Sequence, residues 1–233
     1  MPTRLLSLVG SLLLPVMTAV SCNPEGGYSP AATKDDRAAG AGDRTGKAAD
    51  SAPPVHGAIP DFALTRASDG RTVGRADLLG SVWVADFFFT SCPGGCPIMS
   101  AHMRQLQEHL AAAAKTDPAL ADVKLVSITV DPATDTVGKL NEYARRHDAG
   151  PGWWFLHGDK DAVRKLAFEG FKVSSTEDIN KHSTRLMLVD AAGRLRGWYS
   201  VVPPTGEDQV VDADNFEKLK ADLAAVAAGK KAD

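Results

Sequence analysis

The sequence predicts one α/β domain in which a central mixed β-sheet is flanked by helices. Two observations support this prediction. From residue 56 onward, short β-rich runs alternate with segments of helical periodicity, an order typical of α/β domains. The end of the domain then changes to a hairpin pattern followed by one more helix. A chain of 233 residues is long enough for one such domain with a full core and some appendages.

Three apolar runs predict the strands at the centre of the sheet. They cover residues 82–89 (VWVADFFF), 123–130 and 153–156. They contain few polar residues, as expected of strands that are buried on both faces. Residues 61–65 predict a short edge strand, which is followed by a turn at residues 69–70.

Three helices are predicted between and after these runs. The first has Pro97 in its first turn, and its apolar residues recur every three or four positions on one face: Met99, Met103, Leu106, Leu110 and Ala113. Asp135 or Thr136 can cap the second helix. Residues 161–168 predict the third.

A hairpin and a helix complete the domain. Residues 186–189 and 195–199 lie on either side of an Ala-Ala-Gly turn and predict two antiparallel strands, and residues 216–227 predict the final helix. Together the elements fit a thioredoxin-like sandwich. We expect the domain to span residues 56–228, followed by a disordered tail at residues 229–233.

The first 21 residues predict an export signal. Arg4 supplies a positive charge, and residues 5–20 form an apolar run that is too short to span a bilayer comfortably. The run ends in Ala-Val-Ser-Cys22, which resembles the box that is cleaved before the lipidated cysteine of bacterial lipoproteins. We therefore expect a protein of the bacterial cell envelope that is anchored to the membrane by a lipid on Cys22 and faces the periplasm. Ordinary signal cleavage, or an uncleaved anchor with Cys22 incidental, are the alternatives.

Residues 22–55 predict a flexible tether. From Asn23 to Pro54 the chain contains no Val, Ile, Leu, Met, Phe or Trp. Such a segment cannot bury enough apolar surface to offset the entropy lost on ordering it. A tether of this kind would let an anchored domain reach a neighbour in the membrane.

Composition and charge disfavour nucleic acid as a partner. Hydrophobic residues make up 44% of the chain and charged residues 24%, which is ordinary for a globular protein. The formal net charge is −3, so the chain lacks the basic balance of a general polyanion binder.

The chemistry is concentrated at Cys92 and Cys96, in the segment FFFTSCPGGCP. A buried strand ends there, the chain turns, and a helix begins, so both sulfurs should lie near the helix N-terminus. Unpaired backbone N–H groups and the helix dipole stabilise thiolates, so we expect lowered thiol pKa values. Thiolates serve both metal ligation and disulfide exchange.

The spacing of the two cysteines favours a metal without deciding for it. Three residues separate them, where dithiol oxidoreductases of this fold normally have two, and the wider loop can let both sulfurs share one metal ion. Soft thiolates select Cu(I), with Zn(II) as the main competitor. A structural zinc site needs four ligands, whereas Cu(I) is content with two or three. On spacing alone, a plain Cys92–Cys96 disulfide remains open.

Four motifs resemble the Sco/SenC family of copper proteins: FTSCPGGCP (89–97), SITVDPATDT (127–136), WWFLHGD (153–159) and HSTRLMLVD (182–190). The resemblance extends over residues 56–227. It implies that Cys92, Cys96 and His182 bind copper, as Cu(I) or Cu(II), and that the two cysteines form a disulfide when oxidised. Gly94-Gly95 replaces a more usual acidic or polar residue and its neighbour between the cysteines, and Lys181 adds a positive charge beside His182.

The other histidines have simpler explanations than metal binding. His56 lies at the edge of the domain, His102 and His109 fit partly exposed positions of the first helix, His147 ends a helix as a cation that suits the dipole, and His157 fits a structural role. Only His182 precedes a strand at the position that the family uses. Ser183 and Thr184 follow it, where related reductases carry a cis-proline for substrate docking.

Several other residues have open roles. Asp86, within the strand before the cysteines, either relays protons to the thiols or faces a polar edge. Asp131 and Asp135 lie after the second strand, near the expected site, where they steer a cation, contact a partner or cap a helix. Met99 and Met103 are soft donors, but a core stripe explains both better.

The resemblance implies a metallochaperone without catalytic turnover. Its recipient would be the binuclear copper centre in subunit II of cytochrome c oxidase, with oxidase assembly factors and a periplasmic thiol reductant as further partners. The enzyme alternative is a thiol–disulfide oxidoreductase that keeps the recipient's cysteines reduced. A copper or redox sensor also remains open. A peroxidase of the peroxiredoxin type is disfavoured, because Phe89 stands where such enzymes need threonine.

Overall fold

The computed structural model describes residues 52–173, 183–202 and 213–229. All described residues belong to one compact unit, Thr45–Asp233. The predicted leader, Cys22 and most of the predicted tether lie outside the described residues. Among the helices of the described ranges, none is both long enough and apolar enough to cross a bilayer.

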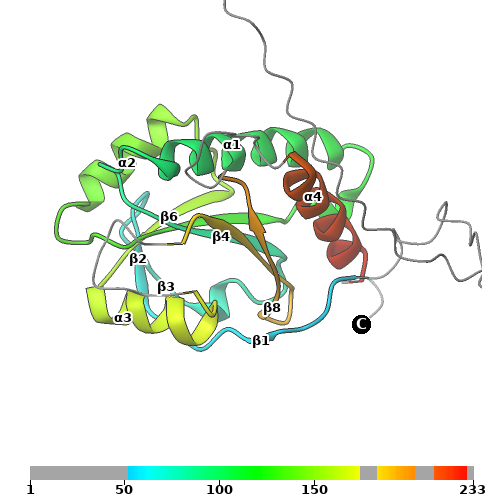
Figure 1. Cartoon of the computed structure of the whole chain (residues 1–233), viewed down its shortest axis with the longest axis horizontal. Coiled ribbons are helices and arrows are strands. Elements are labelled where there is room, and N and C mark those ends of the chain that lie inside the picture. Colours follow the sequence, from blue (N-terminus) through cyan, green and yellow to red (C-terminus); the bar gives the residue numbers. More distant parts are fainter. Residues whose placement is uncertain (1–51, 174–182, 203–212, 230–233) are drawn as a thin grey trace, which may run out of the picture. The chain divides into compact units, whose positions relative to one another are not determined.

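Eight strands of the described residues form one mixed sheet in the order β1-β8-β7-β4-β5-β6-β2-β3 (Figure 1). The central strands β4, β5 and β6 are parallel, and the other pairs, including β4 with β7, are antiparallel. The strands span Gly57–Ala58 (β1), Leu64–Arg66 (β2), Thr72–Val73 (β3), Trp83–Phe88 (β4), Lys124–Thr129 (β5), Trp153–His157 (β6), Arg185–Val189 (β7) and Arg194–Ser200 (β8).

Helices cover both faces of this sheet (Figure 1). One face packs against α1, α2 and α4, and the other against α3 and the π-helical turn that continues it. The helices span Gly95–Ala113 (α1), Val137–Arg146 (α2), Lys160–Lys165 (α3), Leu166–Gly170 (the π turn) and Ala213–Gly229 (α4), with short 3-10 helices at Arg75–Asp77 and Pro118–Leu120. This is the sandwich that the sequence predicts.

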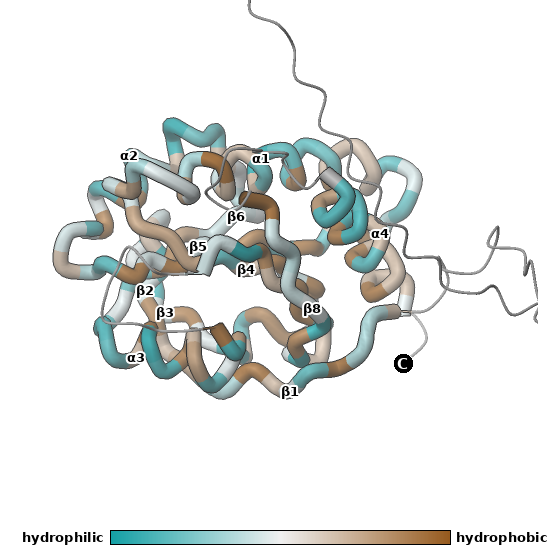
Figure 2. Tube along the Cα trace, viewed as in Figure 1, coloured by the Kyte–Doolittle hydropathy of each residue, from teal (hydrophilic) through white to brown (hydrophobic). Residues whose placement is uncertain are grey.

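The strand that leads to the cysteines is the most buried element of the sheet. All six residues of β4 are buried. Val84 and Phe88 face α1 and α2, whereas Trp83, Ala85 and Phe87 face the layer with α3, because side chains alternate along a strand. Hydrophobic and hydrophilic stretches alternate along α1 (Figure 2), as expected of a helix with one face on the core.

The structure corrects the sequence prediction at the margins of the sheet. The strand predicted at 61–65 forms at Leu64–Arg66, and it is not an edge strand, because β3 pairs with its outer side. The predictions contain neither β1 nor β3, which have two residues each and are too short to show a periodicity. Of the two predicted caps for α2, Thr136 is the one used, since its hydroxyl accepts from Lys139 N at 3.4 Å.

Candidate metal centre

Cys92 and Cys96 lie where β4 gives way to α1. Cys92 is half-buried in the connecting loop, and its N–H donates to Phe89 O at 3.2 Å. Cys96 is in the first turn of α1 and is 0% exposed. The structure records no disulfide between Cys92 and Cys96, so that bond remains a prediction. Of the two residues, Cys92 is therefore the more exposed.

Burial dominates the electrostatics of Cys96. It raises the pKa of the Cys96 thiol well above its usual range, and nearby Cys92 and Asp86 raise it further. A backbone hydrogen bond at Phe89 lowers the pKa by less. The expectation that the helix N-terminus lowers the thiol pKa is therefore wrong for Cys96. Removal of its proton requires a compensating partner, and a metal ion that binds a thiol displaces such a proton.

Gly95 brings the first turn of α1 close to the chain that enters β7. A Cβ atom at Gly95 would lie 3.2 Å from Thr184 Cγ2 and 3.3 Å from Val202 Cγ1. Such a contact is tighter than ordinary packing, so the absence of a side chain at this position permits the close approach. Gly95, the last of the three residues between the cysteines, therefore packs against residues on either side of the β7–β8 hairpin.

His182 lies outside the described residues, so the structure does not place it. Thr184, two residues later, is described and packs beside Gly95. Within residues 52–173, 183–202 and 213–229, no three side chains of the His, Cys, Asp and Glu types form a group that could hold a metal ion. The described part of the candidate site is the soft-donor pair Cys92 and Cys96.

Asp135 joins the cysteine loop to the loop after β5. Its carboxylate is 0% exposed. Thr90 donates to it twice, from the backbone N–H at 3.0 Å and from the hydroxyl, and the Thr129 hydroxyl donates at 2.6 Å. Asp131 stays on its own loop, where its carboxylate accepts weakly from Thr134 N at 3.4 Å. The two acidic residues of the motif therefore have different roles.

Asp86 is a buried carboxylate for which the described residues supply no donor in good hydrogen-bonding geometry. It is 0% exposed, and within the described chain neither of its oxygens meets a donor in hydrogen-bonding geometry. Burial raises the pKa of Asp86 to about 7, and the neighbouring Ser127 hydroxyl on β5 lowers it by less. By strand alternation it points to the same face as Val84 and Phe88, where Cys96 also packs. The prediction that Asp86 faces a polar edge is wrong.

A buried hydrogen bond joins α1 to α2. Tyr143 and Ser100 share a hydrogen bond of 2.8 Å between their hydroxyl groups. Burial raises the pKa of Tyr143 to about 12, and the charges of Asp86, Cys96 and Cys92 add to the effect. The region under the cysteines therefore disfavours negative charge, which matches the direction of the change at Cys96.

The structure offers simpler explanations than metal binding for the other five histidines and for Met99 and Met103. His102 is buried, contrary to the prediction of partial exposure, with Nδ1 at 2.9 Å from Ile98 O and its ring against Phe216. Burial lowers the pKa of His147, helped by Arg146 and Arg104, so the expected helix-end cation is disfavoured. His56 packs on Trp198, His157 Nε2 lies 3.1 Å from Pro132 O, His109 is exposed, and Met99 and Met103 are in the core as predicted.

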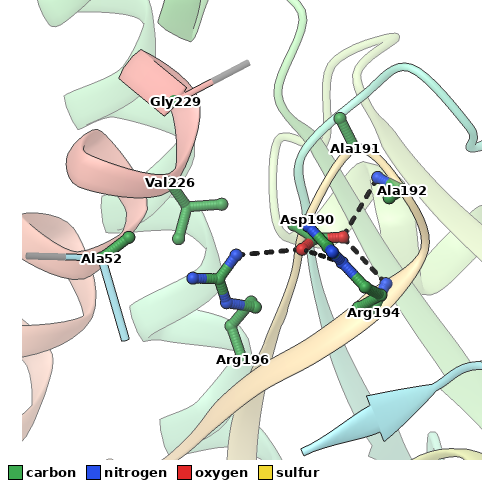
Figure 3. Close-up of a pocket in the computed structure, with 8 residues that line it drawn as sticks. All are labelled: Ala52, Asp190, Ala191, Ala192, Arg194, Arg196, Val226 and Gly229. Carbon is green, nitrogen blue, oxygen red and sulfur yellow. Dashed lines mark hydrogen bonds and ion pairs between the residues drawn. The ribbon is translucent and has the colours of Figure 1, made fainter. Parts of the chain in front are cut away.

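A polar cluster that the sequence analysis missed lies at the opposite end of the sheet (Figure 3). The carboxylate of Asp190 pairs with Arg194 at 2.8 Å and Arg196 at 3.0 Å, and it accepts from two backbone N–H groups of the hairpin turn. Arg196 also donates to Pro53 O at 2.8 Å. The pocket beside this cluster is lined by Ala52 and by Val226 and Gly229 of α4. Neither cysteine lines this pocket. Val189, just before Asp190, pairs with Trp83 at the start of β4, whereas the cysteines follow the end of β4.

Comparison with known sequences identifies relatives over most of the chain. The sequence model of the SCO1/SenC family matches residues 52–213. The SCO1 protein homolog of Bacillus subtilis is 33% identical over 159 residues, which cover 65% of this chain and 79% of that protein. A protein of Stutzerimonas stutzeri that is named for copper binding is 31% identical over 150 residues, or 62% of this chain and 70% of that protein.

Comparison with solved structures agrees. The crystal structure of a SCO1/SenC family lipoprotein from Bacillus anthracis superimposes with a TM-score of 0.61 and 30% identity, covering 75% of this chain and 97% of that one. BsSco, described as a member of the Sco family of cytochrome c oxidase assembly proteins with a disulfide switch, gives a TM-score of 0.61 and 26% identity over 76% of this chain and 96% of that one.

Proposed function

This chain belongs to the SCO1/SenC family, and from that premise we propose that it is a copper metallochaperone of the bacterial cell envelope. It binds one copper ion through Cys92, Cys96 and His182. It delivers that ion to the binuclear copper centre in subunit II of cytochrome c oxidase. The delivered copper is cargo, so the protein needs no catalytic turnover.

The observation that carries this proposal is the packing of Gly95 against Thr184. It brings Gly95, the residue just before Cys96, within van der Waals reach of the chain that follows His182. We infer that His182, two residues before Thr184, joins Cys92 in the loop and Cys96 in the first turn of α1 as the third ligand. Two thiolates and an imidazole form a soft, three-ligand set that suits Cu(I). The relative that is named for copper binding supports the same metal.

Transfer proceeds by ligand exchange. Half-buried Cys92 is the ligand that a recipient thiolate reaches first, and buried Cys96 is released after it. Before copper is taken up, a periplasmic dithiol reductant gives two electrons and two protons to an oxidised Cys92–Cys96 disulfide and is itself oxidised to a disulfide. The disulfide switch of BsSco supports this part of the cycle.

The asymmetry of the pair also favours a second candidate function. An accessible cysteine followed by a buried one is the arrangement that a thiol–disulfide oxidoreductase uses for attack and resolution. In that role the Cys92–Cys96 dithiol reduces a disulfide between the recipient's cysteines, becomes a disulfide itself, and needs no His182. The two functions are separated by the dependence on His182.

The anchored location rests on the leader and on Cys22. A relative of known structure is described as a lipoprotein, which supports it. Mass spectrometry of the N-terminal peptide from membrane fractions tests this part. We expect a chain that begins at a lipid-bearing Cys22, and a chain that retains Met1 contradicts the proposal.

Anaerobic titration with Cu(I) tests the metal site. The full-length chain carries Cys22→Ser, so that only Cys92 and Cys96 offer thiols, and it is reduced and purified in mild detergent. We expect one copper per chain, no tight binding in Cys92→Ser or Cys96→Ser, and affinity weakened roughly tenfold or more in His182→Ala. His109→Ala, on the exposed face of α1, is the matched control and should change nothing.

Two results decide against the chaperone. If Cys96→Ser binds copper as tightly as its parent, the cysteine pair is not the site. If the parent chain binds no copper while its dithiol still reduces disulfides, the oxidoreductase is the correct function.

A further inference from the structure

The buried carboxylate of Asp135 holds the cysteine loop from beneath. It accepts from Thr90 N at 3.0 Å, from the Thr90 hydroxyl, and from the Thr129 hydroxyl at 2.6 Å. Thr129 ends β5, and Phe88, its partner in register, ends β4. One side chain therefore ties together the two loops that leave the same edge of the sheet.

Through Thr90, the hydrogen bonds of Asp135 also restrain the turn that contains Cys92. Thr90 lies two residues before Cys92, inside the turn that is closed by the hydrogen bond from Cys92 N to Phe89 O at 3.2 Å. Fixing both the backbone and the hydroxyl of Thr90 fixes the plane of that turn. The position of the Cys92 Cα then follows from the turn.

Cys96 is held by other means. It is part of α1, whose Met99, Met103 and Leu106 are 0% exposed in the core. The two residues after Pro93 are glycines, and a Cβ at Gly94 would meet nothing within 4 Å. The separation between the two sulfurs therefore depends on the part of the loop before Cys92, where Asp135 acts.

We propose that Asp135 is a positioning residue that sets the distance between Cys92 and Cys96, and with it the copper affinity and the redox equilibrium of the pair. The inference deepens the proposed function and rests on it for the copper effect alone. The effect on the dithiol does not require copper.

The structure disfavours the other roles open to Asp135. Capping of α2 is done by the Thr136 hydroxyl. Steering of a cation needs an accessible charge, whereas this carboxylate is 0% exposed and receives three hydrogen bonds. Each of those donors is neutral, so the contacts need acceptor geometry more than they need the negative charge.

The variants separate the acceptor geometry of Asp135 from its negative charge. In Asp135→Asn the amide oxygen can accept from Thr90 N and Thr129, and the amide NH2 can donate to the Thr90 hydroxyl. Asp135→Ala removes all three contacts. Thr90→Val removes only the hydroxyl contact, and Thr90→Ser keeps it. Asp159→Ala is the matched control, because exposed Asp159 accepts two backbone N–H bonds at the start of α3, on the other face of the sheet.

Each variant of the full-length Cys22→Ser chain is measured in two ways. One is anaerobic Cu(I) affinity. The other is the equilibrium of the Cys92–Cys96 pair in glutathione buffers, in which one glutathione disulfide takes up two electrons and two protons to give two glutathiones. Thermal unfolding is recorded for all variants, so that a loss of stability is seen separately.

We expect Asp135→Ala to weaken copper binding and to shift the dithiol equilibrium, each roughly tenfold, the lower end for partners that orient metal ligands. Thr90→Val should shift both roughly threefold, about half of that effect in free energy. Asp135→Asn and Thr90→Ser should restore both to within about twofold, and Asp159→Ala should lower stability without either change.

Two results overturn the proposal: an Asp135→Ala chain with an unchanged dithiol equilibrium, or an Asp135→Asn chain as impaired as Asp135→Ala, which would assign the role to charge. If the parent chain binds no copper, the proposed function fails, and the dithiol equilibrium still decides the role of Asp135.

Discussion

The buried carboxylates on the hairpin side of the sheet and those on the cysteine side differ in their hydrogen-bond and ion-pair partners. At the hairpin end, Asp190 is neutralised by Arg194 and Arg196 and by two backbone donors (Figure 3). On the cysteine side, Asp135 accepts only from neutral donors, and Asp86, whose oxygens have no donor within the described chain, carries a raised pKa.

The difference indicates that the hairpin side stabilises the domain and that the cysteine side contains the candidate site. A carboxylate with two guanidinium partners stabilises the hairpin and fastens the segment before β1 through Pro53. A buried carboxylate such as Asp86, which meets no donor in good geometry among the described residues, lowers stability at neutral pH. Proteins tolerate such groups mainly at functional sites, where they are offset elsewhere in the fold.

The largest expected effect that tests this contrast is the pH dependence caused by Asp86. Its folded-state pKa of about 7 lies above the ordinary value of 3.8, so the folded state binds more protons than the unfolded chain between these values. The free energy of unfolding therefore falls as pH rises from about 4 to about 7 and is level above. At about 1.4 kcal/mol per pKa unit, the fall is of the order of 4 kcal/mol.

Urea unfolding between pH 4 and 8 measures this effect. Asp86→Asn, which does not titrate, should flatten the decline relative to the parent chain, and the other acids and histidines cancel in the comparison. Parallel pH profiles for the two chains would show that Asp86 does not titrate in this range.

Asp190→Ala should give the next largest effect, on stability alone. It leaves the largely buried Arg196 without its carboxylate and two backbone N–H groups without their acceptor. We expect a loss of about 3 kcal/mol in the free energy of unfolding. Copper affinity at 25 °C should not change, because the cysteines lie at the other end of β4. A weakened copper site in a still-folded chain would break the separation of the two ends.

Gly95→Ala should give the smallest effect, in copper affinity. The added Cβ must displace Thr184 and Val202 by a few tenths of an ångström. We expect a penalty of about 1 kcal/mol, roughly fivefold in Kd. Gly138→Ala is the control, since a Cβ there meets only Thr136 Oγ1, at 3.9 Å. Equal copper affinity in Gly95→Ala and Gly138→Ala would mean that the contact with Thr184 does not support the site.

The sequence predicts the layered fold because its central elements are long and strongly patterned. The runs at 82–89 and 123–130 are buried strands in the structure, and the stripe from Met99 to Leu110 lies in the core. It does not predict β1 and β3, whose two-residue pairings depend on strands far away in the chain.

The sequence predicts which residues could bind the metal, but not the burial and hydrogen bonds that position them. A pair of cysteines between a strand and a helix is visible in the sequence, but the burial of Cys96, which reverses the expected direction of its pKa, depends on α1 packing against the sheet. The contacts of Asp135 with Thr90 join residues 45 positions apart. Its motif marked it as a candidate, but only the tertiary structure shows what it holds.

X-ray absorption at the copper edge tests the central claim most directly. It is recorded on the copper-loaded full-length Cys22→Ser chain and on its His182→Ala variant. We predict two sulfur donors and one nitrogen donor in the first chain, and loss of the nitrogen donor with both sulfurs retained in the second. A copper ion without sulfur donors, or a spectrum that His182→Ala leaves unchanged, would contradict the three-ligand site.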